Sequence, residues 1–309
     1  MSNVKIGIVG LGSICQKVYL PYLSQEKKWS FIGAYSPNEL KRKKICNSYR
    51  INEFSNLPNL LEKCDAIFVN SSTNSHFEIV AEALKKGKDV YVDKPLASSL
   101  DEAEQLVELS IKNNRKLMVG FNRRFAPMYI RAKNNIHRGS LIRIEKYRSN
   151  SIRHENFQTT LLDDYIHLVD TARWLAEPNN SVNGSIKVND NKELIFAEHS
   201  YKSKNNSSIF LDMHRKSGSN MERLELIAED SIVRVKNMNS IEIEKNAKIE
   251  QEVSPPWETI IKTKGFEDAI LHFIESILGN TNPLVDGIEG LKTQQLITKM
   301  MKTGLEIPQ

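Results

Sequence analysis

Apolar runs and amphipathic segments alternate along the first third of the chain. The short apolar runs predict buried parallel strands, and the segments with apolar residues at helical spacing predict helices. We expect strands at Val4–Val9, Ser30–Tyr35, Asp65–Val69, Asp89–Val92 and Lys116–Gly120, and helices at Gln16–Ser24, Phe77–Lys86 and Asp101–Asn113. Strands that alternate with helices build a doubly wound α/β sheet, which is the fold class that we predict for this part.

The alternation stops at Asn122, where we place the boundary between domain 1–121 and domain 122–309. Beyond it, we expect helices at Met128–Arg138, Gly265–Leu278 and Ile288–Lys302, and strands at Leu141–Asn150, Glu193–Lys202, Ser207–Lys216, Met221–Ile227, Ser231–Met238 and Ser240–Glu244. Within one of these strands, Ile209 and Leu211 share a side opposite Asp212. The pattern predicts an α+β domain with a mainly antiparallel open sheet.

Segment 161–175 carries a polar stripe on an otherwise apolar helix. Asp163, His167, Asp170 and Trp174 fall on one face at helical spacing, and we expect this helix to pack on the antiparallel sheet. A carboxylate one turn before an imidazole is suited to moving protons near neutral pH. Taken alone, such a pair is more often a solvated or capped helix face.

Composition narrows the class of protein. The 309 residues are 40% hydrophobic and 26% charged, which fits a soluble globular enzyme or binding protein. Three cysteines without a CxxC pair suit a reducing, cytoplasmic location. The net charge of +5 is scattered along the chain, so we expect no nucleic-acid partner, and no apolar run is long enough for a membrane partner or a leader.

The first predicted strand runs directly into a glycine-rich turn. Gly10, Gly12 and Cys15 form the pattern G-x-G-x-x-C, with cysteine in place of the usual third small residue. The first glycine permits the tight turn, the second lets the backbone approach a pyrophosphate, and the third position packs the helix on the strand. The setting between a strand and a helix predicts a Rossmann dinucleotide-binding domain.

The end of the second strand bears on the choice of cofactor. An NAD-specific domain usually has an acidic residue there, whereas this chain has Ser36, followed by the basic run Lys41–Lys44. A neutral hydroxyl near cations would accommodate a 2′-phosphate, so we favour NADP over NAD. The lysines are also compatible with a solvated helix face.

At this point several motifs together resemble the Gfo/Idh/MocA family of oxidoreductases, and within it the MviM-type branch of virulence-factor homologues. They are GIVGLGSICQ, the loop SSTNSH, DKPLA, GFNRRFAP and the DxxxH pair of the segment at 161–175, in matching order over essentially the whole chain. Glu155–Thr160 and Ser36 depart from the usual pattern, which puts the substrate loop and the cofactor choice in doubt. The resemblance implies an NAD(P)-dependent oxidoreductase that exchanges a hydride with a secondary alcohol or ketone of a sugar, polyol or related small polar substrate.

The same resemblance implies site residues. The catalytic group would be Lys94, Asp163 and His167, with His167 as general acid/base and Lys94 on the same substrate oxygen. Lys94 alone would be an ordinary surface lysine after a strand. For cofactor binding we expect Gly10, Gly12, Ser13, Ile14, Ser36, Lys41, Ser72, Thr73, Asn74, His76, Asp93, Lys94 and Asn122. His76 is as compatible with a structural role.

The remaining candidates concern substrate and partners. Arg123, Arg124, Arg148 and Asn150, beside Asp163 and His167, are the expected substrate-binding residues; the arginines and Arg153 would bind a carboxylate or phosphate, or form ordinary ion pairs. We expect no metal, because no cluster completes a site. A homodimer or homotetramer is expected through the uncovered sheet face, where Ile209 and Leu211 or their alternates would form an apolar patch. A nucleotide-bound sensor without turnover is the alternative function.

Overall fold

The computed structural model describes residues 3–25 and 27–306, which form two compact units. The first unit contains Met1–Phe121 and Glu267–Lys292, and the second contains Asn122–Phe266 and Thr293–Gln309. Within the described residues, no helix is both long and apolar enough to cross a bilayer.

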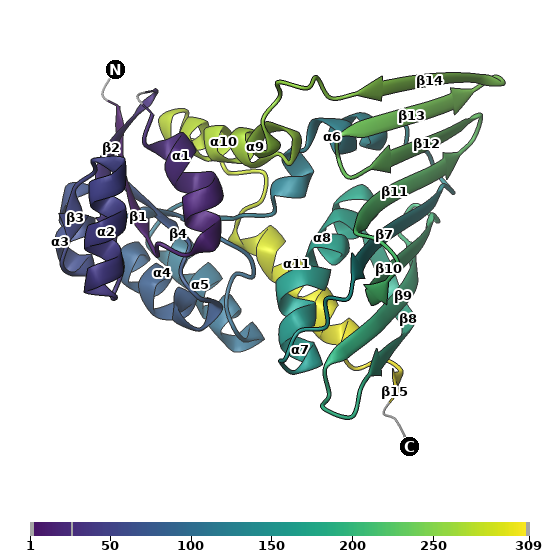
Figure 1. The fold of residues 1–309 in the computed structure, drawn as a ribbon, viewed down its shortest axis with the longest axis horizontal. Coiled ribbons are helices and arrows are strands. Elements are labelled where there is room, and N and C mark those ends of the chain that lie inside the picture. Colours follow the sequence, from purple (N-terminus) through teal and green to yellow (C-terminus); the bar gives the residue numbers. More distant parts are fainter. Residues whose placement is uncertain (1–2, 26, 307–309) are drawn as a thin grey trace. The chain divides into compact units, whose positions relative to one another are not determined.

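The first unit is built on a parallel sheet of six strands in the order β3-β2-β1-β4-β5-β6 (Figure 1). Its strands are β1 Val4–Val9, β2 Trp29–Tyr35, β3 Glu53–Phe54, β4 Ala66–Val69, β5 Asp89–Val92 and β6 Leu117–Val119. Its helices are a π-helix at Cys15–Tyr19, α1 Leu20–Leu23, α2 Glu39–Tyr49, α3 Leu57–Lys63, a 3₁₀-helix at Thr73–Ser75, α4 His76–Lys85 and α5 Leu100–Lys112. The strand order reverses between β1 and β4, where such sheets bind dinucleotides. The predicted Rossmann fold is confirmed.

The sequence had assigned residues 267–292 to the second domain, but the structure places them in the first unit. Helix α10, Phe266–Leu278, turns an apolar face toward the parallel sheet. Its Phe273 ring lies 5.5 Å from that of Phe68 and 5.7 Å from that of Tyr91, both in edge-on geometry. An amphipathic helix reveals only that it has an apolar face, and not which sheet covers that face.

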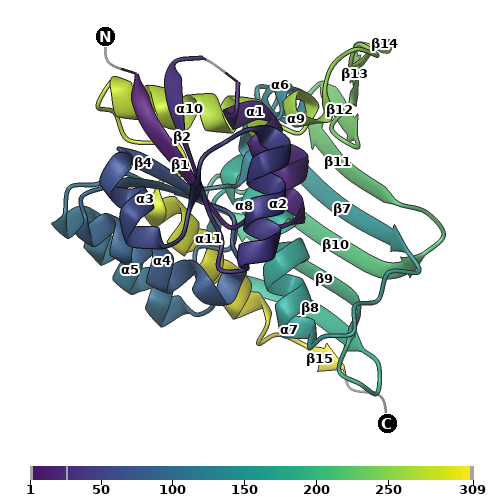
Figure 2. The same ribbon diagram turned by 60° about the vertical axis from the view of Figure 1, so that its left-hand side comes forward.

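The second unit contains a sheet of nine strands in the order β14-β13-β12-β11-β7-β10-β9-β8-β15 (Figure 2). They are β7 Leu141–Ser149, β8 Pro178–Val188, β9 Leu194–Ser203, β10 Ser208–Ser217, β11 Met221–Ala228, β12 Ser231–Lys236, β13 Ser240–Lys245, β14 Lys248–Val253 and β15 Leu305–Glu306. The β7–β10 and β8–β15 pairs are parallel and the others are antiparallel. This confirms the prediction of a mainly antiparallel sheet.

Helices cover one face of the large sheet. They are a 3₁₀-helix at Asn122–Phe125, α6 Pro127–Lys133, α7 Phe157–Thr160, a π-helix at Leu161–Tyr165, α8 Ile166–Leu175, α9 Ile260–Thr263 and α11 Gly287–Met300, which begins in the first unit. Helix α8 packs on β7 and β10, as the sequence predicted. Ile209, Leu211 and Met213 point into this layer and are fully buried.

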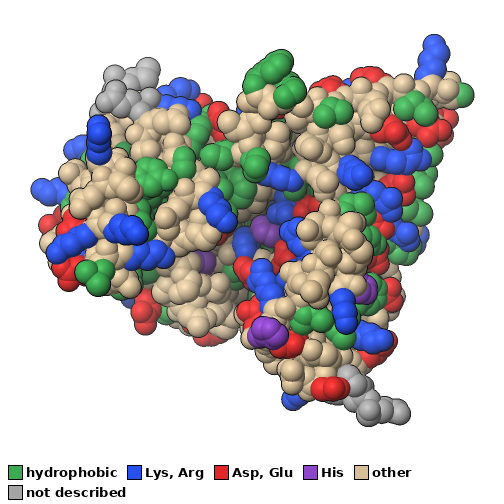
Figure 3. Space-filling view, viewed as in Figure 1, with side chains coloured by type: hydrophobic (Ala, Val, Ile, Leu, Met, Phe, Trp, Pro, Cys, Tyr) green, Lys and Arg blue, Asp and Glu red, His purple; other side chains and the backbone are tan. Residues whose placement is uncertain are grey.

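The opposite face of the sheet is not the apolar patch that the sequence had suggested. Ile209 and Leu211 lie on the covered side, while Phe210, Asp212 and His214 alternate with them on the open side and are half-buried. Along β11–β13, Arg234 contacts Glu225, Glu242 and Glu244. Figure 3 shows charged side chains of both signs interspersed in the region of β11–β14. The open face therefore carries aromatic and charged side chains together.

Candidate active site

The glycine-rich turn after β1 borders a cavity of about 790 Å³ in the first unit. The cavity lies at the carboxyl ends of β1, β2 and β4, and among its lining residues are Gly10, Leu11, Gly12, Ser13, Ile14, Ser36, Pro37, Lys41, Asn70, Ser71, Ser72 and Ser75. One cavity is thus lined by seven of the residues that the sequence predicted for cofactor binding, namely Gly10, Gly12, Ser13, Ile14, Ser36, Lys41 and Ser72. Thr73 and Asn74 lie in the same loop but do not line it.

Three features of this cavity fit a dinucleotide. Gly10 has a φ of +90°, and a Cβ there would lie 2.5 Å from the Ser71 backbone nitrogen. A Cβ at Gly12 would meet only the Asn70 carbonyl oxygen at 3.8 Å, so it would fill open space that a bound group needs. The amide side chain of Asn70 is 3% exposed, yet neither its oxygen nor its nitrogen has a hydrogen-bond partner. A buried amide of this kind is suited to a ligand's polar groups.

The end of β2 is fixed by an arginine that the sequence analysis had not singled out. Arg42 Nη1 donates to the Ser36 carbonyl oxygen at 2.7 Å, and its Nε lies 3.6 Å from Glu53 Oε2. Of the basic run, Lys41 lines the cavity, whereas Lys43 pairs with Glu39 along the exposed side of α2 at 2.6 Å. One lysine of the run thus borders the cavity, and another lies on the solvated face of the helix.

Lys94 emerges at the same edge of the sheet, directly after β5. Its backbone N–H donates to Asp93 Oδ1 at 2.9 Å, and the Lys94–Pro95 peptide bond is cis. The buried His76 ring joins this turn to the cofactor loop, since Nδ1 lies 2.9 Å from the Pro95 carbonyl and Nε2 lies 3.3 Å from that of Ser71. Burial lowers the pKa of His76. Its ring atoms are occupied by backbone, which is the structural role rather than cofactor contact.

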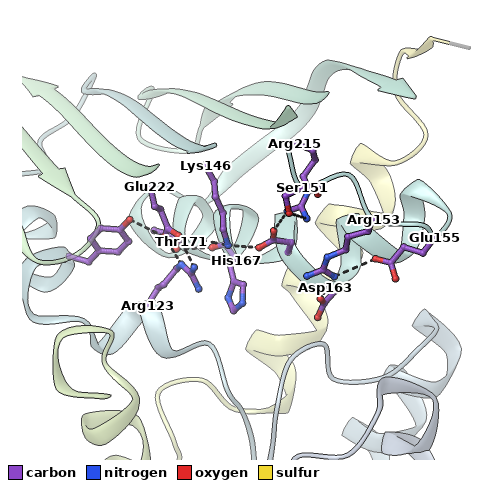
Figure 4. Close-up of polar contacts among 12 residues, drawn as sticks. Arg123, Lys146, Ser151, Arg153, Glu155, Asp163, His167, Thr171, Arg215 and Glu222 are labelled. Atoms are coloured by element: carbon purple, nitrogen blue, oxygen red, sulfur yellow. Dashed lines mark hydrogen bonds and ion pairs between the residues drawn. The ribbon is translucent and has the colours of Figure 1, made fainter. Parts of the chain in front are cut away.

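In the second unit, the DxxxH pair straddles the π-helix at 161–165 and the start of α8. Asp163 forms an ion pair with Arg153, which also reaches Glu155 at 3.3 Å. His167 is half-buried, and Figure 4 shows its imidazole projecting from the helix on the side away from the strands. Asp170 departs from the expected polar stripe, because it is buried and accepts from Arg124 Nε at 2.9 Å and Nη2 at 2.6 Å.

The expected arginine ligands of the substrate are mostly engaged by carboxylates. Arg123 donates to Glu222 from Nε at 2.6 Å and from Nη2 at 2.8 Å. Arg124 forms a buried ion pair with Asp170. For these two side chains the structure gives the ion-pair alternative. Arg148 is half-buried, and Asn150 is exposed with a φ of +45°. Asn122 donates from Nδ2 to the Lys264 carbonyl oxygen at 2.7 Å.

Beneath the DxxxH pair lies a buried ionic network that sequence reasoning missed (Figure 4). Lys146 bonds to Asp164 and lies 3.8 Å from Glu222 Oε2, while Arg215 bonds to the other oxygen of Asp164. Burial and the neighbouring Arg123 lower the pKa of Lys146 to about 8. Burial alone would raise the pKa of Glu222, but Arg123 and Lys146 outweigh it and lower the value to about 2.

A signal for this network was present in the sequence. Lys146 falls in phase with Ile142 and Ile144 on β7, and Arg215 falls in phase with Leu211 and Met213 on β10. A charged residue that keeps the register of an apolar strand face points into the core, where it needs a partner of opposite charge. Within the described residues, no group of three His, Cys, Asp or Glu side chains is placed to hold a metal ion.

Comparisons with known proteins agree with this architecture. Residues 4–121 match the oxidoreductase family with an NAD-binding Rossmann fold, and residues 127–246 match the YceM-like C-terminal domain. The oxidoreductase YceM of Salmonella typhimurium is 38% identical over 306 residues, which cover 99% of each chain. The inositol 2-dehydrogenase of Paracoccus denitrificans is 25% identical over 275 residues, covering 82% of this chain and 80% of that one.

Among solved structures, the dehydrogenase MviM from Clostridium difficile is 47% identical, with a TM-score of 0.94. The match covers 97% of this chain and 99% of that one, so both units have counterparts. With the glycine turn, the dinucleotide-sized cavity and these similarities in place, the conclusion is that the chain belongs to the Gfo/Idh/MocA family of oxidoreductases.

Proposed function

We propose that this protein is an NAD(P)-dependent dehydrogenase or reductase that acts on a secondary alcohol or ketone of a sugar, polyol or related small polar substrate. The observation that carries the proposal is the cavity around Gly10 and Gly12, with Lys94 at the end of a nearby strand of the same sheet. The bound nicotinamide supplies or accepts the hydride. The chain's residues bind and orient the substrate and move one proton.

His167 is proposed as the group that moves this proton. In the direction of oxidation it takes the proton of the substrate hydroxyl, while the carbon–hydrogen pair of electrons leaves as a hydride. The Lys94 ammonium is proposed to bind the same oxygen and to stabilise the negative charge that develops on it. Asp163, held by Arg153, is proposed to orient His167 or an adjacent substrate hydroxyl.

Lys41 is proposed to select the cofactor, because it lines the cavity close to Ser36, which stands where an NAD-specific domain usually has an acidic residue. We expect NADPH to bind more tightly than NADH. Lys41→Ala should weaken NADPH binding about tenfold, or about 1.4 kcal/mol, and leave NADH nearly unchanged. Calorimetric titration of both cofactors measures this.

Lys43→Ala is the matched control, since Lys43 lies in the same helix but pairs with Glu39. It should bind both cofactors like the wild type. NADH binding tighter than NADPH by about tenfold would contradict the proposed preference, as would equal losses in the two lysine variants.

We also propose a homodimer, or a tetramer of such dimers, in the cytoplasm, formed through the open face of the large sheet. Phe210 and Phe196 offer aromatic surface there among polar neighbours. Phe210→Asp should convert the dimer to a monomer in light scattering at micromolar concentration. Ile111→Asp, at an exposed position of α5, should not. A monomeric wild-type protein would contradict this assembly.

A further inference from the structure

Positive charges outnumber negative ones on the covered side of the second unit's sheet. We call Arg123, Lys146, Arg148, Arg215 and Lys264 the basic cluster; the carboxylates within it are Asp164 and Glu222. Five cations against two carboxylates leave a formal excess of three positive charges. Counting the adjoining Arg153, Asp163 and Glu155 still leaves an excess of two. Charges removed from water normally have partners, so this imbalance requires an explanation.

The cations themselves show the effect of the imbalance. Burial lowers the pKa of Lys264, with Arg123 and Arg148 adding to the effect through repulsion. Burial also lowers the pKa of Arg215, and Arg153 and Arg148 repel its charge. The pKa of Lys146 is lowered as well. For three cations of the cluster, the protein therefore disfavours the charged form relative to water. An anion placed among them would reverse that penalty.

The hydrogen-bonding capacity still open in the cluster is concentrated at Arg148. Arg123 forms an ion pair with Glu222. Arg215 forms an ion pair with Asp164 and donates to the Ser151 carbonyl oxygen at 2.9 Å. Lys264 Nζ bonds to the Asn237 carbonyl oxygen. Arg148 has no hydrogen bond or ion pair with any part of the chain that the structure describes, although it is half-buried. Its planar fork is the geometry that binds two oxygens of a carboxylate or phosphate.

The strand that carries Arg148 is joined through Lys146 to the helical segment that carries His167, the residue proposed to transfer the proton. Arg148 follows Lys146 by two positions on β7, so both side chains leave the strand on the covered side. Lys146 is bonded to Asp164, which lies next to Asp163 and three positions before His167. Figure 4 shows Lys146 and His167 in one view of this region. Lys146 of the cluster thus bonds to the same helical segment that carries His167.

We infer that the substrate carries an anionic group, a carboxylate or a phosphate, which Arg148 binds with support from Lys264. The inference rests on the proposed function, because it places the anion on the molecule that His167 acts on. A neutral polyol would leave the excess positive charge of the cluster uncompensated. An acidic or phosphorylated sugar compensates it and is oriented by the bidentate contact.

Calorimetric titration of matched ligands, with NADP⁺ at saturation, tests this. The pairs are D-gluconate with D-glucitol and D-glucose 6-phosphate with D-glucose, with inorganic phosphate as the smallest probe. We expect at least one anionic member to bind more tightly than its neutral partner. Arg148→Gln should weaken that binding roughly tenfold to hundredfold, the range for losing a hydrogen bond to a charged group. The pair that responds distinguishes carboxylate from phosphate.

Arg143→Gln is the control, because Arg143 is on the same strand with its side chain on the opposite face, over the Phe210 ring. It should bind the anions like the wild type. The inference is overturned if no probe anion binds, if neutral ligands bind equally well, or if both arginine variants lose the same affinity. Arg148-dependent binding without any redox change of the nicotinamide would retain this anion site and refute the proposed dehydrogenase.

Discussion

His167→Ala is expected to reduce turnover by roughly two to four orders of magnitude, the usual loss when a positioned general acid/base is removed. Lys94→Ala should have a comparable effect, because the charge on the substrate oxygen would lose its ammonium partner. Both variants should bind NADP(H) nearly as the wild type does, so that the loss lies in kcat rather than in cofactor affinity. Steady-state kinetics and cofactor titration on the same preparations measure the two quantities.

The chain offers matched controls for these variants. His137 is an exposed histidine after α6, and Lys86 is an exposed lysine at the end of α4. Alanine at either position should leave kcat unchanged. If turnover persists at the wild-type rate in the His167 or Lys94 variant, the assigned proton-transfer and charge-stabilising roles are wrong.

Asp170→Ala is expected to lower the free energy of unfolding of the second unit by about 3–5 kcal/mol, because it removes the buried carboxylate that accepts two hydrogen bonds from the Arg124 guanidinium. The two side chains are 1% and 2% exposed. Thr293 Oγ1 also donates to Asp170 at 2.8 Å, so the substitution opens a network that ties α8 to α11. Urea unfolding followed by circular dichroism measures the change.

Replacing both partners separates the buried charge from the lost packing. The double variant Arg124→Met/Asp170→Leu removes the buried cation together with its carboxylate and should recover most of the stability that Asp170→Ala loses. Glu39→Ala, which breaks the exposed pair with Lys43, should leave the unfolding midpoint unchanged. An Asp170→Ala protein as stable as the wild type would contradict the structural role given to this pair.

The strands that sequence reasoning predicted well are those with apolar residues in a regular pattern. The bounds of β1 and β5 agree with the prediction, because both strands are buried on two faces and end in glycine or polar residues. Strand β14 is exposed along its whole length, so no buried face marks it in the sequence. Strand β8 begins Pro-Asn-Asn-Ser and was also missed, since its apolar residues Val182, Ile186 and Val188 are widely spaced among polar ones. Their pairing partners, rather than their own residues, define these strands.

The site also contains features that depend on neighbouring residues and features that depend on residues far apart in the sequence. The turn at Gly10–Gly12 could be interpreted from sequence because its function depends on neighbouring residues. The partner of Arg123 is Glu222, which is 99 positions away, so sequence alone left its role open between substrate binding and ion pairing. Separations of 18 and 51 positions likewise hid the network of Lys146, Asp164 and Arg215. Only the fold brings these charges together.

The central claim is hydride exchange that depends on His167. The most direct test follows the absorbance of reduced nicotinamide when the protein is mixed with NADP⁺ or NAD⁺ and a panel of sugars, polyols and their acids and phosphates. His167→Ala is assayed beside the wild type. We expect the wild type to reduce the cofactor with at least one member of the panel and the variant to lose this activity. Cofactor binding with no turnover on any member, or turnover that the variant retains, would contradict it.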